Sequence, residues 1–209
     1  IVNFKKTFNL TKQIIKYCKK FNITLIYVSS TSLYENSKKK ILVSSTSNNI
    51  NPNNDYSKLK LKEENLIFSK LKKNFYVFRL PSVVGKSMNT NFNVTINKFC
   101  KETIKFGKVN IWKNNLYLNK PYLLIDDFCK VILSTTTKSK FKNGILNIIS
   151  INLKVIDIIN IIFKFKKAKI NFIKSENKYD LIFKKKGKNI IHFSRNKRDF
   201  NNVLKLLLK

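Results

Sequence analysis

Two predominantly apolar runs, each preceded by a helical pattern, constrain the fold of this chain most. Residues 23–28 (ITLIYV) and 74–80 (NFYVFRL) have the length and the β-branched and aromatic content of parallel strands buried on both faces. Apolar residues recur at helical spacing over residues 3–20 and 56–73. Because parallel strands require a crossover connection, this order predicts an α/β fold with a doubly wound, Rossmann-like parallel sheet.

The rest of the chain is less regular. We expect a loop over residues 29–55, which are polar and rich in Asn. Beyond Pro81 the periodicity predicts helices over 91–106, 126–134, 153–165 and 199–208, and strands over 122–125, 145–149, 170–173 and 189–193.

The charge of the chain is strongly positive, with 43 Lys and Arg against 11 Asp and Glu and a formal net charge of +32. Such a charge ordinarily indicates a protein that binds nucleic acid. However, 40 of the basic residues are Lys and 3 are Arg, whereas phosphate recognition favours the bidentate Arg fork. Lys, Asn and Ile also share A/T-rich codons. The composition therefore favours coding bias over nucleic-acid binding.

The cysteines and the single histidine exclude several classes of site. Cys18, Cys100 and Cys129 form no C-x-x-C pair, and His192 is the only histidine, so we predict neither a disulfide framework nor a metal site. No apolar run is long enough for a membrane-spanning helix, and no leader precedes the first periodic segment. We expect a cytoplasmic protein that does not bind membranes.

Polar groups that could perform chemistry follow the first apolar run. The serines of this cluster are Ser29, Ser30 and Ser32. Tyr56 and Lys60 lie one helical turn apart at the start of the next helix, and an ammonium beside a phenol predicts a pKa for Tyr56 lowered from about 10 toward neutrality. Tyr56 is thus a candidate general acid and base, with Ser30 holding the reacting oxygen.

Six segments match one set of motifs in order: NFKKTFNL (3–10), LIYVSSTSLYE (25–35), DYSKLKLKEENL (55–66), FRLPSVVG (78–85), YLLIDDFCKVIL (122–133) and GILNIIS (144–150). Over about residues 1–165 the chain thereby resembles the extended short-chain dehydrogenase/reductase family, the NAD-dependent epimerases and dehydratases of nucleotide sugars. Five positions depart from its motifs, with Lys6 and Glu35 at glycines, Leu59 at a serine, Ser82 at an asparagine and Lys120 at an arginine.

The resemblance implies a division of the chain and of its chemistry. Residues 1–85 would form the C-terminal part of a dinucleotide-binding Rossmann domain. Residues 86–209 would form mostly a substrate-binding region of mixed α/β structure, with some segments returning to the Rossmann sheet. The implied catalytic residues are Tyr56, Lys60 and Ser30. Those implied to bind NAD or NADP are Asn3, Ser29, Tyr56, Lys60 and Pro81, and those implied to bind the nucleotide-sugar substrate are Ser30, Ser32, Ser82 and Lys120.

One motif of the family has no counterpart. No glycine precedes Gly85, so the glycine-rich turn that cradles the cofactor pyrophosphate is not in this sequence. Together with a first residue that is not Met, this predicts a chain truncated at its N-terminus. Relatives often pair through helices like residues 56–73, which makes a homodimer an open expectation.

The resemblance leaves several reactions open. Sugar 4,6-dehydratases carry an acidic pair where this chain has Thr31 and Ser32, which argues against dehydration. Epimerisation at C4 needs only the Ser, Tyr and Lys that are present, so we expect an NAD(P)-dependent nucleotide-sugar epimerase. The alternatives are a nucleotide-sugar reductase of the same family, or a non-catalytic basic binding protein on a decayed dehydrogenase scaffold.

Overall fold

The computed structural model describes residues 4–34, 40–46, 50–88, 90–92, 94–138, 142–174 and 180–208. Its helices are α1 (Phe4–Phe21), α2 (Asp55–Lys70), α3 (Thr95–Phe106), α4 (Ile125–Lys138), α5 (Val155–Phe165) and α6 (Lys197–Leu207), with 3₁₀ turns η1 (Thr31–Tyr34) and η2 (Lys113–Asn115). Its strands are β1 (Leu25–Ser30), β2 (Lys40–Val43), β3 (Phe75–Leu80), β4 (Ser82–Val84), β5 (Lys108–Trp112), β6 (Asn119–Leu124), β7 (Gly144–Ile149), β8 (Ile151–Lys154), β9 (Lys169–Ile173), β10 (Asp180–Phe183) and β11 (Ile190–His192).

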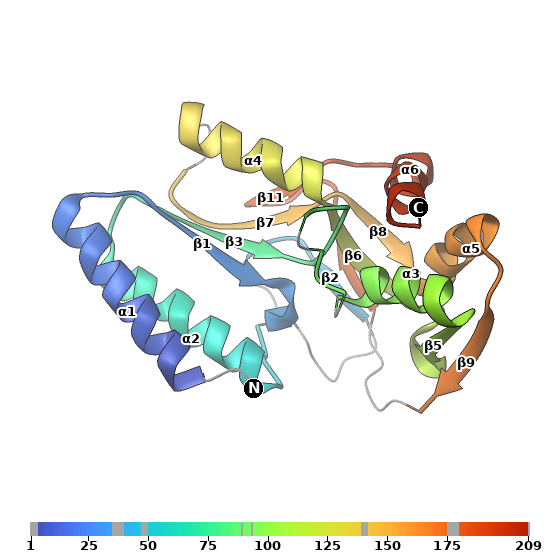
Figure 1. The fold of residues 1–209 in the computed structure, drawn as a ribbon. Helices are drawn as coiled ribbons and strands as arrows, with labels where there is room; N and C mark the ends of the chain where they lie inside the picture. Colours follow the sequence, from blue (N-terminus) through green and yellow to red (C-terminus); the bar gives the residue numbers. More distant parts are fainter. Residues whose placement is uncertain are drawn as a thin grey trace.

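A parallel four-stranded sheet, in the order β1-β3-β7-β11, forms the centre of one half of the molecule. Helices α1 and α2 cover one face of it, and α4 covers the other (Figure 1). Every residue of β3 is buried, with Phe75 and Val77 packed among residues of α1 and α2, and Tyr76 and Phe78 packed toward α4. The predicted α/β fold with a Rossmann-like parallel sheet is confirmed.

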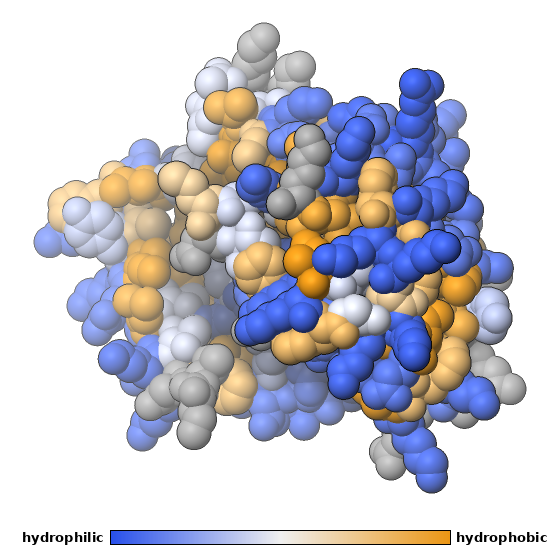
Figure 2. Space-filling model, turned by 45° about the vertical axis from the view of Figure 1, so that its right-hand side comes forward, coloured by the Kyte–Doolittle hydropathy of each residue, from blue (hydrophilic) through white to orange (hydrophobic). Residues whose placement is uncertain are grey.

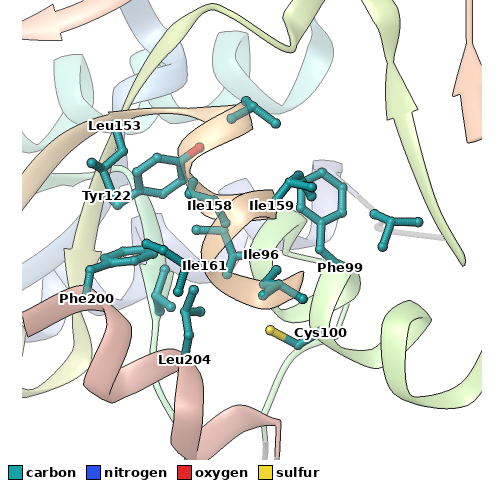
Figure 3. Close-up of a cluster of buried hydrophobic side chains, with 14 of the residues drawn as sticks. Ile96, Phe99, Cys100, Tyr122, Leu153, Ile158, Ile159, Ile161, Phe200 and Leu204 are labelled. Carbon is teal, nitrogen blue, oxygen red and sulfur yellow. The ribbon is translucent and has the colours of Figure 1, made fainter. Parts of the chain in front are cut away.

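The second half of the molecule contains three smaller sheets. Sheet β4-β6-β8 is mixed, whereas the pairs β5-β9 and β2-β10 are parallel. The largest described cluster of buried side chains comes from strands β4, β5, β6 and β8 and helices α3, α5 and α6. It includes Tyr122, Ile159 and Phe200 (Figure 3). Strands β7 and β11 come late in the sequence, but they belong to the central sheet with β1 and β3.

The prediction of a loop over residues 29–55 is wrong in part, because Ser29 and Ser30 end β1, Asp55 begins α2, and the segment between them contains η1 and β2. Strand β2 is only four residues long and pairs with β10, which lies far away in the sequence. Strands β4, β5, β8 and β10 were likewise not predicted. The helix predicted from residue 153 begins at Val155, since residues 151–154 form β8. Each missed strand is three to five residues long, too short for periodicity to identify.

Gly85 lets strand β4 approach the start of α4. A Cβ atom at this position would lie 2.2 Å from Ile125 Cγ2, well inside any van der Waals contact. The glycine in the FRLPSVVG motif therefore has a packing role, since it allows β4 and the adjoining β6–α4 junction to come together.

Figure 2 shows hydrophilic residues spread over the visible face, with hydrophobic residues between them. Within the described part of the chain, no helix combines the length and the apolar character needed to cross a bilayer.

The substitution Phe200→Ala tests how much the buried cluster around α6 contributes to stability. The side chain of Phe200 is fully buried, and its ring centre lies 5.8 Å from that of Tyr122. We expect Phe200→Ala to lower the free energy of unfolding by about 3–5 kcal/mol, because it removes apolar contacts and leaves a cavity. Urea denaturation checks this. Leu206→Ala, on the exposed side of the same helix, should change the free energy of unfolding by less than about 0.5 kcal/mol.

Candidate active site

A buried ion pair joins α2 to the central sheet. Arg79 on β3 donates from Nε to Glu64 Oε1 at 3.0 Å and from Nη2 to Oε2 at 2.6 Å, and both side chains are at most 3% exposed. The Ser29 hydroxyl also donates to Glu64 Oε1, at 2.5 Å. Burial alone would lower the pKa of Arg79, but Glu64 and Tyr34 raise it on balance. The guanidinium therefore remains charged and keeps Glu64 paired.

The same guanidinium extends the network to η1 and β7. Arg79 Nη1 donates to the Tyr34 hydroxyl at 2.8 Å, and this hydroxyl donates to Asn147 Oδ1 at 3.0 Å. Four motif positions widely separated in sequence thus meet in one buried network: Tyr34, Glu64, Arg79 and Asn147. The network fixes β1, β3 and β7 relative to α2, near the carboxyl ends of β1 and β3.

Ser30 and Tyr56 meet at the end of β1. Ser30 is the last residue of the strand, and Tyr56 lies in the first turn of α2, whose start is fixed by a reciprocal capping box between Asn54 and Ser57. The Ser30 hydroxyl lies close enough to the phenol of Tyr56 to act on its pKa. Tyr56 is 47% exposed, so its phenol remains accessible. The backbone N–H of Ser32 donates to Ser30 Oγ at 3.1 Å and orients it.

Lys60 lies beside this pair but is held by β1. Its Nζ donates to the Val28 carbonyl at 2.9 Å and to the Tyr27 hydroxyl at 3.1 Å, and it lies 5.9 Å from the ring centre of Tyr56. Burial lowers the pKa of Lys60, against the opposing effect of the carboxylates of Glu63 and Glu64. The structure therefore brings Ser30, Tyr56 and Lys60 to one edge of the sheet.

The prediction of a lowered pKa for Tyr56 is wrong for this structure. Burial raises the pKa of its phenol, the neighbouring Ser30 hydroxyl opposes this, and the charge of Glu63 adds to the rise. The Lys60 ammonium donates to Tyr27 and Val28. It lies near the Tyr56 ring, but the described contacts include no hydrogen bond from it to the Tyr56 hydroxyl, which a lowered pKa would need.

Three residues of this region, Thr11, Tyr27 and Glu63, do not belong to the site predicted from the sequence. Tyr27 on β1 donates its hydroxyl to Glu63 Oε2 at 2.5 Å, and Thr11 on α1 donates to Glu63 Oε1. Glu63 is 1% exposed. The sequence does contain an indication that Glu63 is buried. It lies at helical spacing between Lys60 and the buried Ile67, on the face of α2 that packs against the sheet.

The other predicted site residues lie in different settings. Ser29 is buried and its hydroxyl is bound to Glu64, while Asn3 is outside the described residues. Pro81 is buried where β3 continues into β4. The half-buried Ser32 has a side-chain oxygen that is enclosed, with no hydrogen-bond partner in the described part of the chain.

The predicted substrate residues Ser82 and Lys120 lie on sheet β4-β6-β8. Ser82 on β4 pairs with Tyr122 on β6. Lys120 lies two residues before Tyr122 on β6, so Ser82 and Lys120 are near neighbours on this sheet. Both are half-buried. They belong to a different sheet from Ser30, and Pro81 links the two sheets.

The family model described as "NAD dependent epimerase/dehydratase family" matches residues 2–148. The match covers more than half of the chain, which therefore belongs to this family. No curated protein sequence matches the chain significantly.

Solved structures share the fold at low sequence identity. MoeE5 in complex with UDP-glucuronic acid and NAD is 15% identical, with a TM-score of 0.69 over 93% of this chain and 63% of its own. UDP-glucuronic acid 4-epimerase from Bacillus cereus in complex with NAD is 19% identical, with a TM-score of 0.71 over 95% of this chain and 67% of its own. L-threonine dehydrogenase from Phytophthora infestans is 15% identical, with a TM-score of 0.71 over 95% of this chain and 68% of its own. The chain thus spans less than two thirds of MoeE5 and about two thirds of the other two.

Arg79→Met tests the buried ion pair. The substitution keeps an unbranched apolar stem but leaves Glu64 buried without its cation, so we expect a loss of about 3–5 kcal/mol in the free energy of unfolding. Lys197→Met removes a cation from the exposed pair with Asp157, where N and O lie 2.9 Å apart, and should reduce stability by less than about 1 kcal/mol. Equal losses in the two variants, measured by urea denaturation, would contradict the importance of the buried pair.

Proposed function

We propose that this chain carries the proton-transfer site of an NAD(P)-dependent nucleotide-sugar epimerase that acts at C4. The convergence of Ser30, Tyr56 and Lys60 at the end of β1 is the observation that carries the proposal. In open α/β sheets, ligands bind outside the carboxyl ends of the strands, which is where these side chains lie.

The residues present fit the nicotinamide end of the cofactor. Ser30 and Tyr56 present hydroxyls at the sheet edge, Lys60 holds its ammonium beside them, and the enclosed oxygen of Ser32 has hydrogen-bonding capacity to offer. When bound, the cofactor would supply a hydride acceptor and a positive charge close to the phenol. Tyr56 and Lys60 would hold its nicotinamide ribose, and the backbone at Ser29 and Pro81 would border it.

Tyr56 would exchange a proton with the hydroxyl on the sugar carbon. Ser30 would hold the sugar oxygen, because its hydroxyl lies beside the phenol of Tyr56. Lys60 would stabilise the phenolate by its charge, since the ammonium and the ring of Tyr56 are already close in space. General acid–base catalysis of this kind contributes about 10²- to 10⁴-fold to a rate.

Ser82 and Lys120 would contact the nucleotide part of the substrate. A lysine attracts a diphosphate as a point charge, with less directionality than an arginine fork. Two of the solved structures with this fold contain a UDP-sugar, UDP-glucuronic acid in one and UDP-glucose in the other, which supports this substrate class. Because Thr31 and Ser32 supply no carboxylate beside Ser30, epimerisation is favoured over dehydration.

Tyr56→Phe tests the proposed acid and base. The variant keeps the ring but has no proton to exchange, so we expect turnover of UDP-sugars by the full-length protein to fall about 10²- to 10⁴-fold. The thermal midpoint should change little, because Tyr56 is half-exposed. Tyr117→Phe, at an exposed tyrosine of the second half of the molecule, is the matched control and should retain activity. Unchanged turnover in Tyr56→Phe would overturn the assignment.

Titration of the phenol tests the same site without turnover. Since burial raises the pKa of Tyr56 above its ordinary value of about 10, its hydroxyl remains protonated at neutral pH and ionises only in more alkaline solution. The difference in tyrosinate absorbance between the wild-type protein and Tyr56→Phe should therefore develop above about pH 10. Adding NAD should move this difference to lower pH. A midpoint already near neutrality without NAD would contradict the structure.

A further inference from the structure

Glu63 is a buried carboxylate that the proposed reaction does not use. It is 1% exposed, and each of its oxygens accepts a hydrogen bond from a hydroxyl, one from Thr11 and one from Tyr27. Glu64, the next residue, is neutralised by the guanidinium of Arg79. Among the described contacts of Glu63, no cation pairs with it directly, so its charge is available to act on groups nearby.

The Tyr27 hydroxyl connects Glu63 to Lys60. It donates to Glu63 Oε2 and accepts from Lys60 Nζ at 3.1 Å. A phenol has one proton, so donation to the carboxylate leaves its oxygen lone pairs facing the ammonium. Burial, together with the hydrogen bond to Glu63, strongly raises the pKa of Tyr27, so the phenol does not ionise and the direction of both bonds is maintained.

Lys60 needs such a restraint to act at a defined place. Its ammonium is carried on a flexible four-carbon stem. A single hydrogen bond to the Val28 carbonyl would leave the position of the nitrogen poorly defined. The Tyr27 hydroxyl supplies a second acceptor on the same strand, β1, and two acceptors define the position of the nitrogen.

We propose that Glu63 is a positioning residue that fixes the Lys60 ammonium through the Tyr27 hydroxyl. The positioning itself stands on the contacts above, and its effect on catalysis rests on the proposed function. The charged and titratable groups around Lys60 are Glu63, Glu64 and Tyr56 on α2 and Tyr27 on β1. Of the two carboxylates, only Glu64 has a guanidinium partner in the described contacts.

The sign of the electrostatic effect follows from these neighbours. The charge of Glu63 raises the pKa of Lys60 and opposes the lowering caused by burial. Removing that charge with Glu63→Gln should lower the pKa of Lys60 and increase the fraction of free amine at a given pH. Removing the hydroxyl with Tyr27→Phe should act in the same direction, because the ammonium loses an acceptor.

Competitive acetylation of the full-length protein, read by mass spectrometry of the peptide that contains Lys60, measures this fraction. At a pH below the pKa, a fall of one unit raises the labelling rate about tenfold. We expect Glu63→Gln and Tyr27→Phe each to raise Lys60 labelling by about three- to tenfold. Labelling of Lys98, far away in α3, is the internal reference and should not change.

Tyr122→Phe is the matched control, because it removes the hydroxyl of another buried tyrosine, one that packs in a separate cluster. Its Lys60 labelling should equal that of the wild-type protein. If Glu63→Gln does not fold, as judged by circular dichroism, Tyr27→Phe decides the question. Unchanged Lys60 labelling in the folded variants would overturn the proposal, even if their stability fell, because lost stability alone is what a merely structural role predicts.

Turnover separates this proposal from the proposed function. In an active enzyme, both variants should raise KM for the nicotinamide cofactor about tenfold and shift the pH profile, while Tyr122→Phe should do neither. If the wild-type protein has no turnover but both variants increase Lys60 labelling, the positioning of Lys60 by Glu63 stands and the assigned reaction fails.

Discussion

The ion pair between Glu64 and Arg79 is the interaction that the candidate active site depends on. It lies where α2, β1 and β3 meet, and a buried charge without a partner there would be strongly destabilising. The pair therefore specifies one placement of α2 against the sheet. Because Tyr56, Lys60 and Glu63 all project from α2, that placement also determines where the proposed catalytic groups lie.

Consecutive carboxylates on one helix serve different purposes in this arrangement. Glu64 faces the strand ends and is satisfied by a guanidinium, which is a structural role. Glu63 faces Tyr27 and Thr11, where hydroxyls satisfy its hydrogen bonds without removing its charge. One carboxylate therefore fixes the helix, and its neighbour sets the electrostatic surroundings of Lys60.

The sequence was informative where segments are long or motifs are local. The runs 23–28 and 74–80 correspond to β1 and β3, and Tyr56 and Lys60 do lie on one helix face beside Ser30. It was uninformative where the structure depends on distant pairing. Strand β2 exists because it pairs with β10, and neither contains enough residues to show a period. The donors to Glu63 come from α1 and β1, so no local pattern identified them.

The pKa of Tyr56 is raised and not lowered, because helical spacing alone does not bring Lys60 into hydrogen-bonding contact with the phenol. Two side chains one turn apart share a face, but each bonds to the strongest partner within reach, and for Lys60 that partner is β1. The phenol then experiences burial and the charge of Glu63, and both favour its protonated form. If Tyr56 is the base, its ionisation must come from positive charge supplied on binding. Proton transfer would then begin only when the cofactor is in place, which protects the site from ionising without its ligand.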